Sequence, residues 1–122
     1  FINIPTTLLA MVDASAGGMT GINMKRFKNA IGFFNKPDQV FIFPRFLKTL
    51  PNDELLSGYA EMVKHILISN ASEWKKMQLL HPLQIKNWLP LIQHSVSVKQ
   101  NIAQHDYKET GLRKVLNFGH TI

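Results

Sequence analysis

The stretch at residues 51–68, PNDELLSGYAEMVKHILI, decides how the rest of the chain can be arranged. Pro51, Asn52 and Asp53 supply a turn, an N-cap and a carboxylate in the first turn, and together they predict that a helix begins here. With about 100° of rotation per residue, such a helix has two distinct faces. We expect the apolar face to pack against the rest of the chain; it holds Leu55, Leu56, Tyr59, Met62, Val63, Ile66 and Leu67.

The opposite face of this helix is polar, and the pattern leaves two interpretations of it open. It holds Glu54, Ser57, Gly58, Glu61, Lys64 and His65. A solvated face with a Glu61–Lys64 pair, worth about 0.3 kcal/mol, is the more common arrangement. Gly58, however, weakens a helix interior by about 1 kcal/mol and often marks the close approach of another segment. Glu61 and His65 are one turn apart, a spacing from which a carboxylate and an imidazole can reach the same metal ion.

The charge and composition of the chain favour a small anionic ligand over nucleic acid. The 122 residues suit one domain, and 14 Lys and Arg against 8 Asp and Glu give a net charge of +6. Because the basic residues are dispersed, we expect no nucleic-acid partner, although a non-catalytic module that binds nucleic acid is the alternative from another class. Without cysteine, and without an apolar run near the ~20 residues that span a bilayer, the chain is expected to be cytoplasmic and to have no membrane partner.

Both ends of the sequence suggest a piece of a longer protein. The chain opens without Met on an alternating apolar run, residues 1–4, which reads as a strand that needs partners, and it stops inside an expected helix. Residues 5–12 predict a helix that begins at a Pro-Thr-Thr sequence. Asp13 follows this apolar run, either as a buried carboxylate that needs a partner or as a capping or surface residue.

A glycine-rich loop and a hairpin are expected next. Gly17, Gly18 and Gly21 would let backbone N–H groups approach an anion closely, although the loop matches neither the dinucleotide fingerprint nor the Walker loop. Residues 30–34 and 39–43 flank a turn at residues 35–38, a pattern that predicts an antiparallel hairpin. A basic cluster precedes the first of these strands, and most such clusters are simply solvated; it consists of Lys25, Arg26, Lys28 and Asn29.

The last third of the sequence reads as helices. One is capped at Asn70 and runs to about residue 80, and another covers residues 83–105, with Pro90 kinking or dividing it. Lys99 falls on the apolar stripe of the second helix, where it either extends its ammonium group to the surface, the more common outcome, or is held inside by an anionic partner. A final helix over residues 112–122 would carry three polar side chains on one face, those of Arg113, Asn117 and His120.

Four blocks of the sequence together resemble the 3-dehydroquinate synthase family of sugar-phosphate cyclases. They read PTTLLAMVDASAGGMTGIN, FKNAIGFF, LKTLPNDELLSGYAEMVKHILI and KETGLRKVLNFGHT. The resemblance implies a mainly α chain with a small antiparallel β-hairpin, as part of a fold that joins an α/β nucleotide-binding domain to an α-helical domain. Residues 1–50 would form an interdomain segment with the glycine-rich loop and the hairpin, and residues 51–122 an incomplete helical domain that binds metal and substrate.

The same resemblance implies an activity and its cofactors. Members of the family use NAD and a divalent metal, Zn²⁺ or Co²⁺, to eliminate phosphate from 3-deoxy-arabino-heptulosonate 7-phosphate and close the ring of 3-dehydroquinate, in the shikimate pathway. The full-length protein would be a lyase and a homodimer that acts on a small sugar-acid phosphate. A sister cyclase such as 2-deoxy-scyllo-inosose synthase, or a degenerate inactive homologue, remains the alternative.

Site residues are also implied by the resemblance, position by position. The expected metal ligands are Glu61 and His120. The expected catalytic residues are Asp13, Lys64, Lys99 and Glu109. The expected substrate-binding residues are Lys28, Asn29, Arg113 and Asn117. The expected cofactor-binding residues are Thr6, Thr7, Asp13, Lys28, Phe46, Thr49 and Leu50.

Two departures from the family pattern affect these expectations. The glycine-rich loop of the family normally reads GGKTG, and this chain has Met19 where that lysine stands. A thioether cannot replace an ammonium group that faces an anionic substrate, so we expect reduced or altered activity. The family's third metal ligand is a His beyond residue 122, and two protein ligands are fewer than the usual three. We therefore expect this chain alone to bind zinc weakly and to turn over no substrate.

Overall fold

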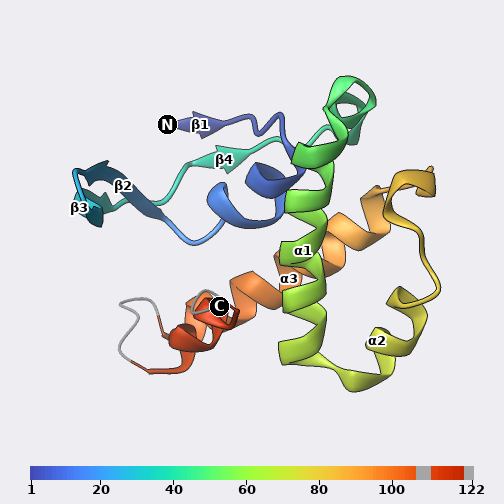
Figure 1. Cartoon of the computed structure of the whole chain (residues 1–122). Helices are drawn as coiled ribbons and strands as arrows, with labels where there is room; N and C mark the ends of the chain where they lie inside the picture. The colour runs from blue at the N-terminus through green and yellow to red at the C-terminus, as the bar shows by residue number, and fades with distance from the viewer. Residues whose placement is uncertain (107–110, 120–122) are drawn as a thin grey trace.

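The computed structural model describes residues 1–106 and 111–119, without the side chains at positions 19, 28, 29, 34 and 71. Helices dominate it, and the small β elements lie to one side (Figure 1), which confirms the predicted class. The strands are β1 (Ile2–Asn3), β2 (Met19–Met24), β3 (Phe27–Phe34) and β4 (Gln39–Val40). The α-helices are α1 (Asn52–Ser69), α2 (Ala71–Met77) and α3 (Leu89–His105). The shorter turns of helix are the π-helix η1 (Ala10–Ala14) and the 3₁₀ segments η2 (Pro44–Thr49), η3 (Pro82–Gln84) and η4 (Leu112–Asn117).

The helix α1 is packed on two sides, not one. Leu55, Met62 and Ile66 lie in the core as predicted, but Leu56 and Leu67 are 39% and 45% exposed, so their expected burial is wrong. Part of the polar face is covered instead, because η1 and the Leu8–Leu9 segment that leads into it pack on α1, the latter at Gly58; Ser57 stays exposed. A Cβ atom at Gly58 would lie 2.5 Å from the backbone nitrogen of Leu9, which confirms that this glycine marks a close approach.

The core fills the space between α1, α3 and η1. Its buried apolar residues come from five elements, η1, η2, α1, α2 and α3, and from the segments beside them: Leu8, Met11, Val12, Leu47, Leu55, Met62, Ile66, Met77, Trp88 and Ile92. Because η1 contacts both α1 and α3, the residue at its end, Asp13, is carried to the junction of the two long helices.

The hairpin is real but lies elsewhere in the sequence than predicted. β2 pairs with β3 in antiparallel register, with Ile22 opposite Ile31, and the chain reverses at Lys25, whose φ is +54°. β4 pairs in parallel with β1, so the expected hairpin around residues 35–38 is wrong. That segment instead leaves the base of the β2–β3 hairpin, where the Asn35 backbone N–H donates to the Gly18 carbonyl at 2.7 Å.

Of the remaining helices, α2 begins at a side-chain cap, whereas α3 and η4 have no side-chain cap. The Asn70 side chain accepts a hydrogen bond from the Ser72 backbone N–H at 2.9 Å, and α2 starts there but ends at Met77, before residue 80. Pro90 stands in the first turn of α3 and therefore divides the predicted helix without kinking it. The expected final helix is a short 3₁₀ segment, η4, in the described part of the chain. Among the described residues, no helix is long and apolar enough to span a membrane.

Candidate functional site

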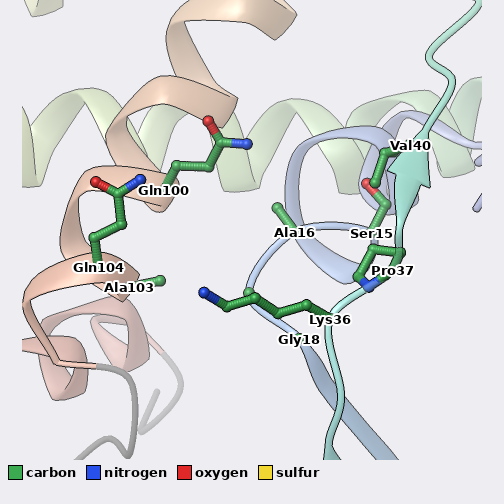
Figure 2. Close-up of a pocket in the computed structure, with 10 residues that line it drawn as sticks. Ser15, Ala16, Gly18, Lys36, Pro37, Val40, Gln100, Ala103 and Gln104 are labelled. Atoms are coloured by element: carbon green, nitrogen blue, oxygen red, sulfur yellow. The ribbon is translucent and has the colours of Figure 1, made fainter.

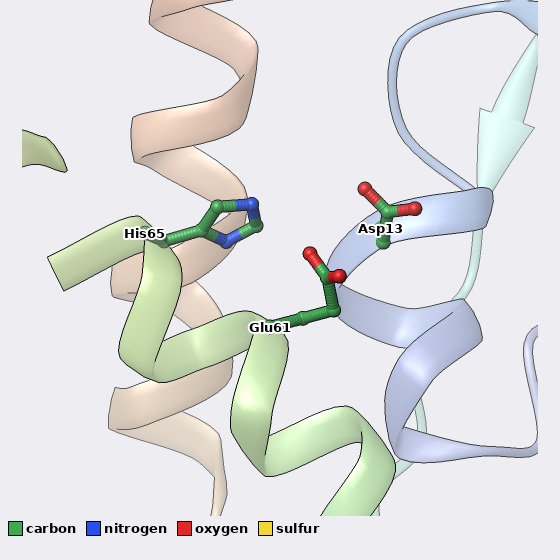
Figure 3. A group of neighbouring side chains, drawn as sticks. All are labelled: Asp13, Glu61 and His65. Atoms are coloured by element: carbon green, nitrogen blue, oxygen red, sulfur yellow. The ribbon is translucent and has the colours of Figure 1, made fainter. Parts of the chain in front are cut away.

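Three potential metal-ligating side chains converge where η1 meets α1. Asp13 comes from η1, and Glu61 and His65 come from successive turns of α1 (Figure 3). One ligand atom from each of them lies within 4.8 Å of the others. The spacing of Glu61 and His65 in the sequence had suggested part of this cluster, but not that Asp13 joins it.

Two ammonium groups pair with the carboxylates of this cluster. The Lys99 Nζ donates to the backbone oxygen of Asp13 at 2.6 Å and also forms an ion pair with its carboxylate. Because Lys99 is only 6% exposed, the expectation that it extends to the surface is wrong, and Asp13 is the anionic partner that holds it inside. Lys64 is also buried and forms an ion pair with Glu61, so the solvated-face interpretation of this pair is wrong as well.

Burial and neighbouring charges determine the protonation states. Burial alone would raise the pKa of Asp13, but the charge and hydrogen bond of Lys99 outweigh it, and the pKa lies below its usual range. Burial, reinforced by the charge of Lys64, lowers the pKa of His65 to about 4. At neutral pH the cluster therefore contains an ionised Asp13 and a neutral imidazole at His65, the states in which both can ligate a metal.

His65 is held from one side only. Its side chain is fully buried, and its Nδ1 lies 2.5 Å from the Oγ of Ser95, a buried residue of α3. Its Nε2 is buried and has no hydrogen-bond partner within the described part of the chain. Buried polar atoms usually have a partner, so this nitrogen is the clearest sign that the cluster receives a further group. His65 was absent from the residues implied by the family resemblance.

Arg113 lies beside Lys99 and contacts the glycine-rich loop. Its Nη2 donates to the Gly17 carbonyl at 3.1 Å, and its backbone N–H donates to the Asp106 carboxylate at 2.9 Å. Gly17 has a φ of +105°, and a Cβ atom there would lie 2.8 Å from the Arg113 Nη2 and 3.5 Å from the Lys99 Cε. The groups that approach the loop closely here are two basic side chains, and the approach of an anion to its backbone N–H groups stays a prediction.

A cavity of about 250 Å³ adjoins the same loop. Gly17 and Gly18 form one wall of it, and Gln100 and Gln104 of α3 form another. In Figure 2 the Lys36 side chain extends from the β3–β4 segment towards α3. The lining combines polar side chains and backbone with a larger apolar area, to which Pro37 and Val40 contribute.

Other predicted site residues lie outside the cluster or outside the described residues. Arg113 is buried and Asn117 is exposed, because the tighter 3₁₀ turn of η4 turns positions four apart to different sides; the expectation that they share a face is wrong. Glu109 and His120 lie outside the described residues, as do the side chains of Lys28 and Asn29 in β3.

The residues expected at the NAD site have local roles. The Thr7 Oγ1 accepts a hydrogen bond from the Ala10 backbone N–H at 3.1 Å, and the Thr49 Oγ1 donates to the Phe46 carbonyl at 3.4 Å. Thr6 is exposed, Phe46 is 43% exposed and Leu50 is half-buried. These contacts stabilise the ends of η1 and η2, and the assignment of the five residues to a cofactor site stays a prediction.

Solved structures with this fold are sugar-phosphate cyclases. A 2-deoxy-scyllo-inosose synthase complexed with carbaglucose-6-phosphate, NAD⁺ and Co²⁺ is 28% identical and superimposes with a TM-score of 0.79 over 98% of this chain and 34% of its own. ValA, the 2-epi-5-epi-valiolone synthase of Streptomyces hygroscopicus with NAD⁺ and Zn²⁺ bound, is also 28% identical, with a TM-score of 0.74 over 98% of this chain and 35% of its own.

Sequence comparison covers the whole chain. The family models of the 3-dehydroquinate synthase N-terminal and C-terminal regions match residues 1–57 and 58–122. The 3-dehydroquinate synthase of Parabacteroides distasonis is 50% identical over 99% of this chain, and that of Latilactobacillus sakei is 44% identical over 100% of it. The chain spans only 35% of the length of each. Because both family models match in order and without a gap, this chain belongs to the 3-dehydroquinate synthase family.

Proposed function

We propose that the protein to which this chain belongs is a 3-dehydroquinate synthase, which converts 3-deoxy-arabino-heptulosonate 7-phosphate into 3-dehydroquinate with NAD and a divalent metal. The proposal is supported by relatives that carry this name at 42–50% identity, although the chain spans about a third of their length. The single observation that carries it is the convergence of Asp13, Glu61, Lys64 and Lys99, from η1, α1 and α3, on one partly enclosed cluster.

The donor set of the cluster fits a divalent cation. Two carboxylates and a buried imidazole nitrogen without a partner among the described residues are ligands that Zn²⁺ and Co²⁺ accept. Glu61 would hold the cation, and His120 is proposed as a second ligand on the basis of the family resemblance alone. When bound, the cation would supply Lewis acidity to a substrate oxygen.

The side chains of this chain would bind and orient the substrate. The Lys64 and Lys99 ammonium groups and the Arg113 guanidinium form a cationic wall that suits a carboxylate and a phosphate. The ionised Asp13 carboxylate would accept a hydrogen bond from a substrate hydroxyl and remain charged because Lys99 is beside it. NAD would act as the acceptor and donor of hydride, with Thr6, Thr7, Lys28, Phe46, Thr49 and Leu50 proposed to line its site.

The test is an assay of the purified longer protein with NAD and Co²⁺ or Zn²⁺. We expect it to release phosphate from 3-deoxy-arabino-heptulosonate 7-phosphate and to form 3-dehydroquinate. A parallel reaction with glucose 6-phosphate tests the sister cyclase function. Release of phosphate from glucose 6-phosphate alone would contradict the proposal in favour of the sister cyclase, and release from neither substrate would indicate a degenerate homologue.

A further inference from the structure

We propose that a groove between η2, the first turn of α1 and the segment from η3 to α3 binds a small organic anion, an aromatic or alicyclic ring that carries a carboxylate. The groove has a volume of about 540 Å³, within the range of about 300–1,000 Å³ that is usual for small-molecule sites. None of its lining residues belongs to the metal cluster or to the residues expected to bind NAD or substrate. The inference therefore goes beyond the proposed function.

The floor of the groove is apolar and belongs to the core. Leu47, Leu55 and Trp88 line it and are each less than 10% exposed. The Trp88 ring is held by an edge-to-face contact with Tyr59, whose ring centroid is 6.4 Å away. Leu83, 44% exposed, adds an apolar side chain at the surface end of the groove. An apolar floor with an indole ring suits a planar or alicyclic hydrocarbon ring.

The rim of the groove is basic. Arg45 and Lys48 of η2 and Lys86 of the segment before α3 line the groove and are exposed. None of the three forms an ion pair with another residue that the structure describes, although Asp53 and Glu54 stand close by in the sequence of α1. No acidic side chain lines the groove. An anionic ligand would supply the missing negative charge, and the planar fork of Arg45 suits a carboxylate.

The short helix η2 separates this rim from the residues expected at the NAD site. A 3₁₀ helix has three residues per turn, so side chains three positions apart lie in one row. Arg45 and Lys48 form one row of η2, and Phe46 and Thr49 form another. The two rows face different sides of the helix, so a ligand in the groove and a cofactor beside Phe46 would not compete for the same side chains.

Calorimetric titration of the intact longer protein with 2-naphthoate tests the inference, with 2-naphthamide as a neutral probe of the same ring. We expect 2-naphthoate to bind at least about fivefold more tightly, and its affinity to fall as salt is added. Arg45→Gln and Lys86→Gln should each weaken its binding by about threefold to fivefold and leave 2-naphthamide unaffected. Lys75→Gln, at an exposed position of α2 outside the groove, is the matched control and should cause no change. Equal binding of the two probes, or equal effects of all three substitutions, would overturn the inference.

The indole N–H resonance of Trp88 locates the bound probe without a change to the groove. In protein labelled with ¹⁵N-tryptophan, 2-naphthoate should shift the Trp88 signal through its ring current and leave the signal of Trp74, which lies outside the groove lining, in place. Trp74→Phe and Trp88→Phe assign the two signals. Binding without a shift at Trp88 would overturn the inference, and so would no binding at all, the result expected if another segment of the longer protein fills the groove. Neither result depends on whether the protein forms 3-dehydroquinate.

Discussion

Substitution of Gly58 by Ala tests how the cluster is assembled, because the Leu8–Leu9 segment that leads into η1 packs on α1 at Gly58. An added Cβ would lie 2.5 Å from the Leu9 backbone nitrogen and 2.6 Å from the Leu8 Cβ, well inside the ordinary contact of about 3.5–4.0 Å. Ala should stabilise the helix by about 1 kcal/mol. Overpacking in a filled interior costs about 1–3 kcal/mol, and the value should be at the upper end because the nearest atom is backbone and cannot rotate away.

The expected net effect is a free energy of unfolding lower by about 2 kcal/mol, a large part of the total of about 5–15 kcal/mol for a typical domain. Urea denaturation followed by circular dichroism measures it. Ser57→Ala, at the neighbouring exposed position of α1, is the matched control and should be neutral or slightly stabilising. A Gly58→Ala variant more stable than the unmodified protein would refute the close packing of η1 on α1, and with it the position of Asp13 beside Glu61.

Three further predictions concern the charged groups. Asp13→Asn leaves the buried Lys99 without its carboxylate and should lower the free energy of unfolding by about 1–3 kcal/mol, less than for a fully buried pair because Asp13 is 37% exposed. The control Glu73→Gln breaks the exposed pair with Lys76 and should cause little change in chemical denaturation. Equal effects of the two substitutions would contradict the expectation. Because the pKa of His65 is lowered to about 4 from 6.5, the unfolded chain binds the proton more readily than the folded one, so stability should fall as the pH drops from 6.5 towards 4. This dependence of the free energy of unfolding on pH should diminish in His65→Gln and persist in His105→Gln. Met19→Lys in the intact enzyme should raise kcat/KM, and an unchanged value would contradict the role expected for that position.

The sequence predicted the elements whose signals are local. α1 begins where residues 51–53 predicted it, although the N-cap is Pro51 and not Asn52 as expected, and no side chain caps this end. α2 begins at Asn70, whose side chain caps it, because capping depends on residues close together in the chain. The predicted position of the hairpin was wrong because residues 39–43 have a strand-like pattern, as residues 19–24 also do, and either segment could pair with residues 30–34. Which of the two pairs with β3 depends on the reversal at Lys25 and on a parallel partner, β1, far away in the sequence.

The site could be predicted only in part. The sequence could not decide whether Lys99 and Asp13 are buried, because each is the partner that allows the other to be buried. The two residues are 86 positions apart in the chain, so their pairing has no local signal. Both interpretations of the polar face of α1 stayed open, because periodicity cannot reveal that η1 packs against part of it. The spacing of Glu61 and His65 indicated that their side chains lie close together, but Ser95, the hydrogen-bond partner of the imidazole, could not be identified before α3 was placed beside α1.

Anomalous X-ray diffraction at the zinc edge, on crystals of the intact protein grown with Zn²⁺, tests most directly that these separate segments build one metal centre. We expect a single strong peak within about 2.0–2.2 Å of the Glu61 carboxylate, on the side that faces Asp13. A zinc peak bound away from Glu61 would contradict this account.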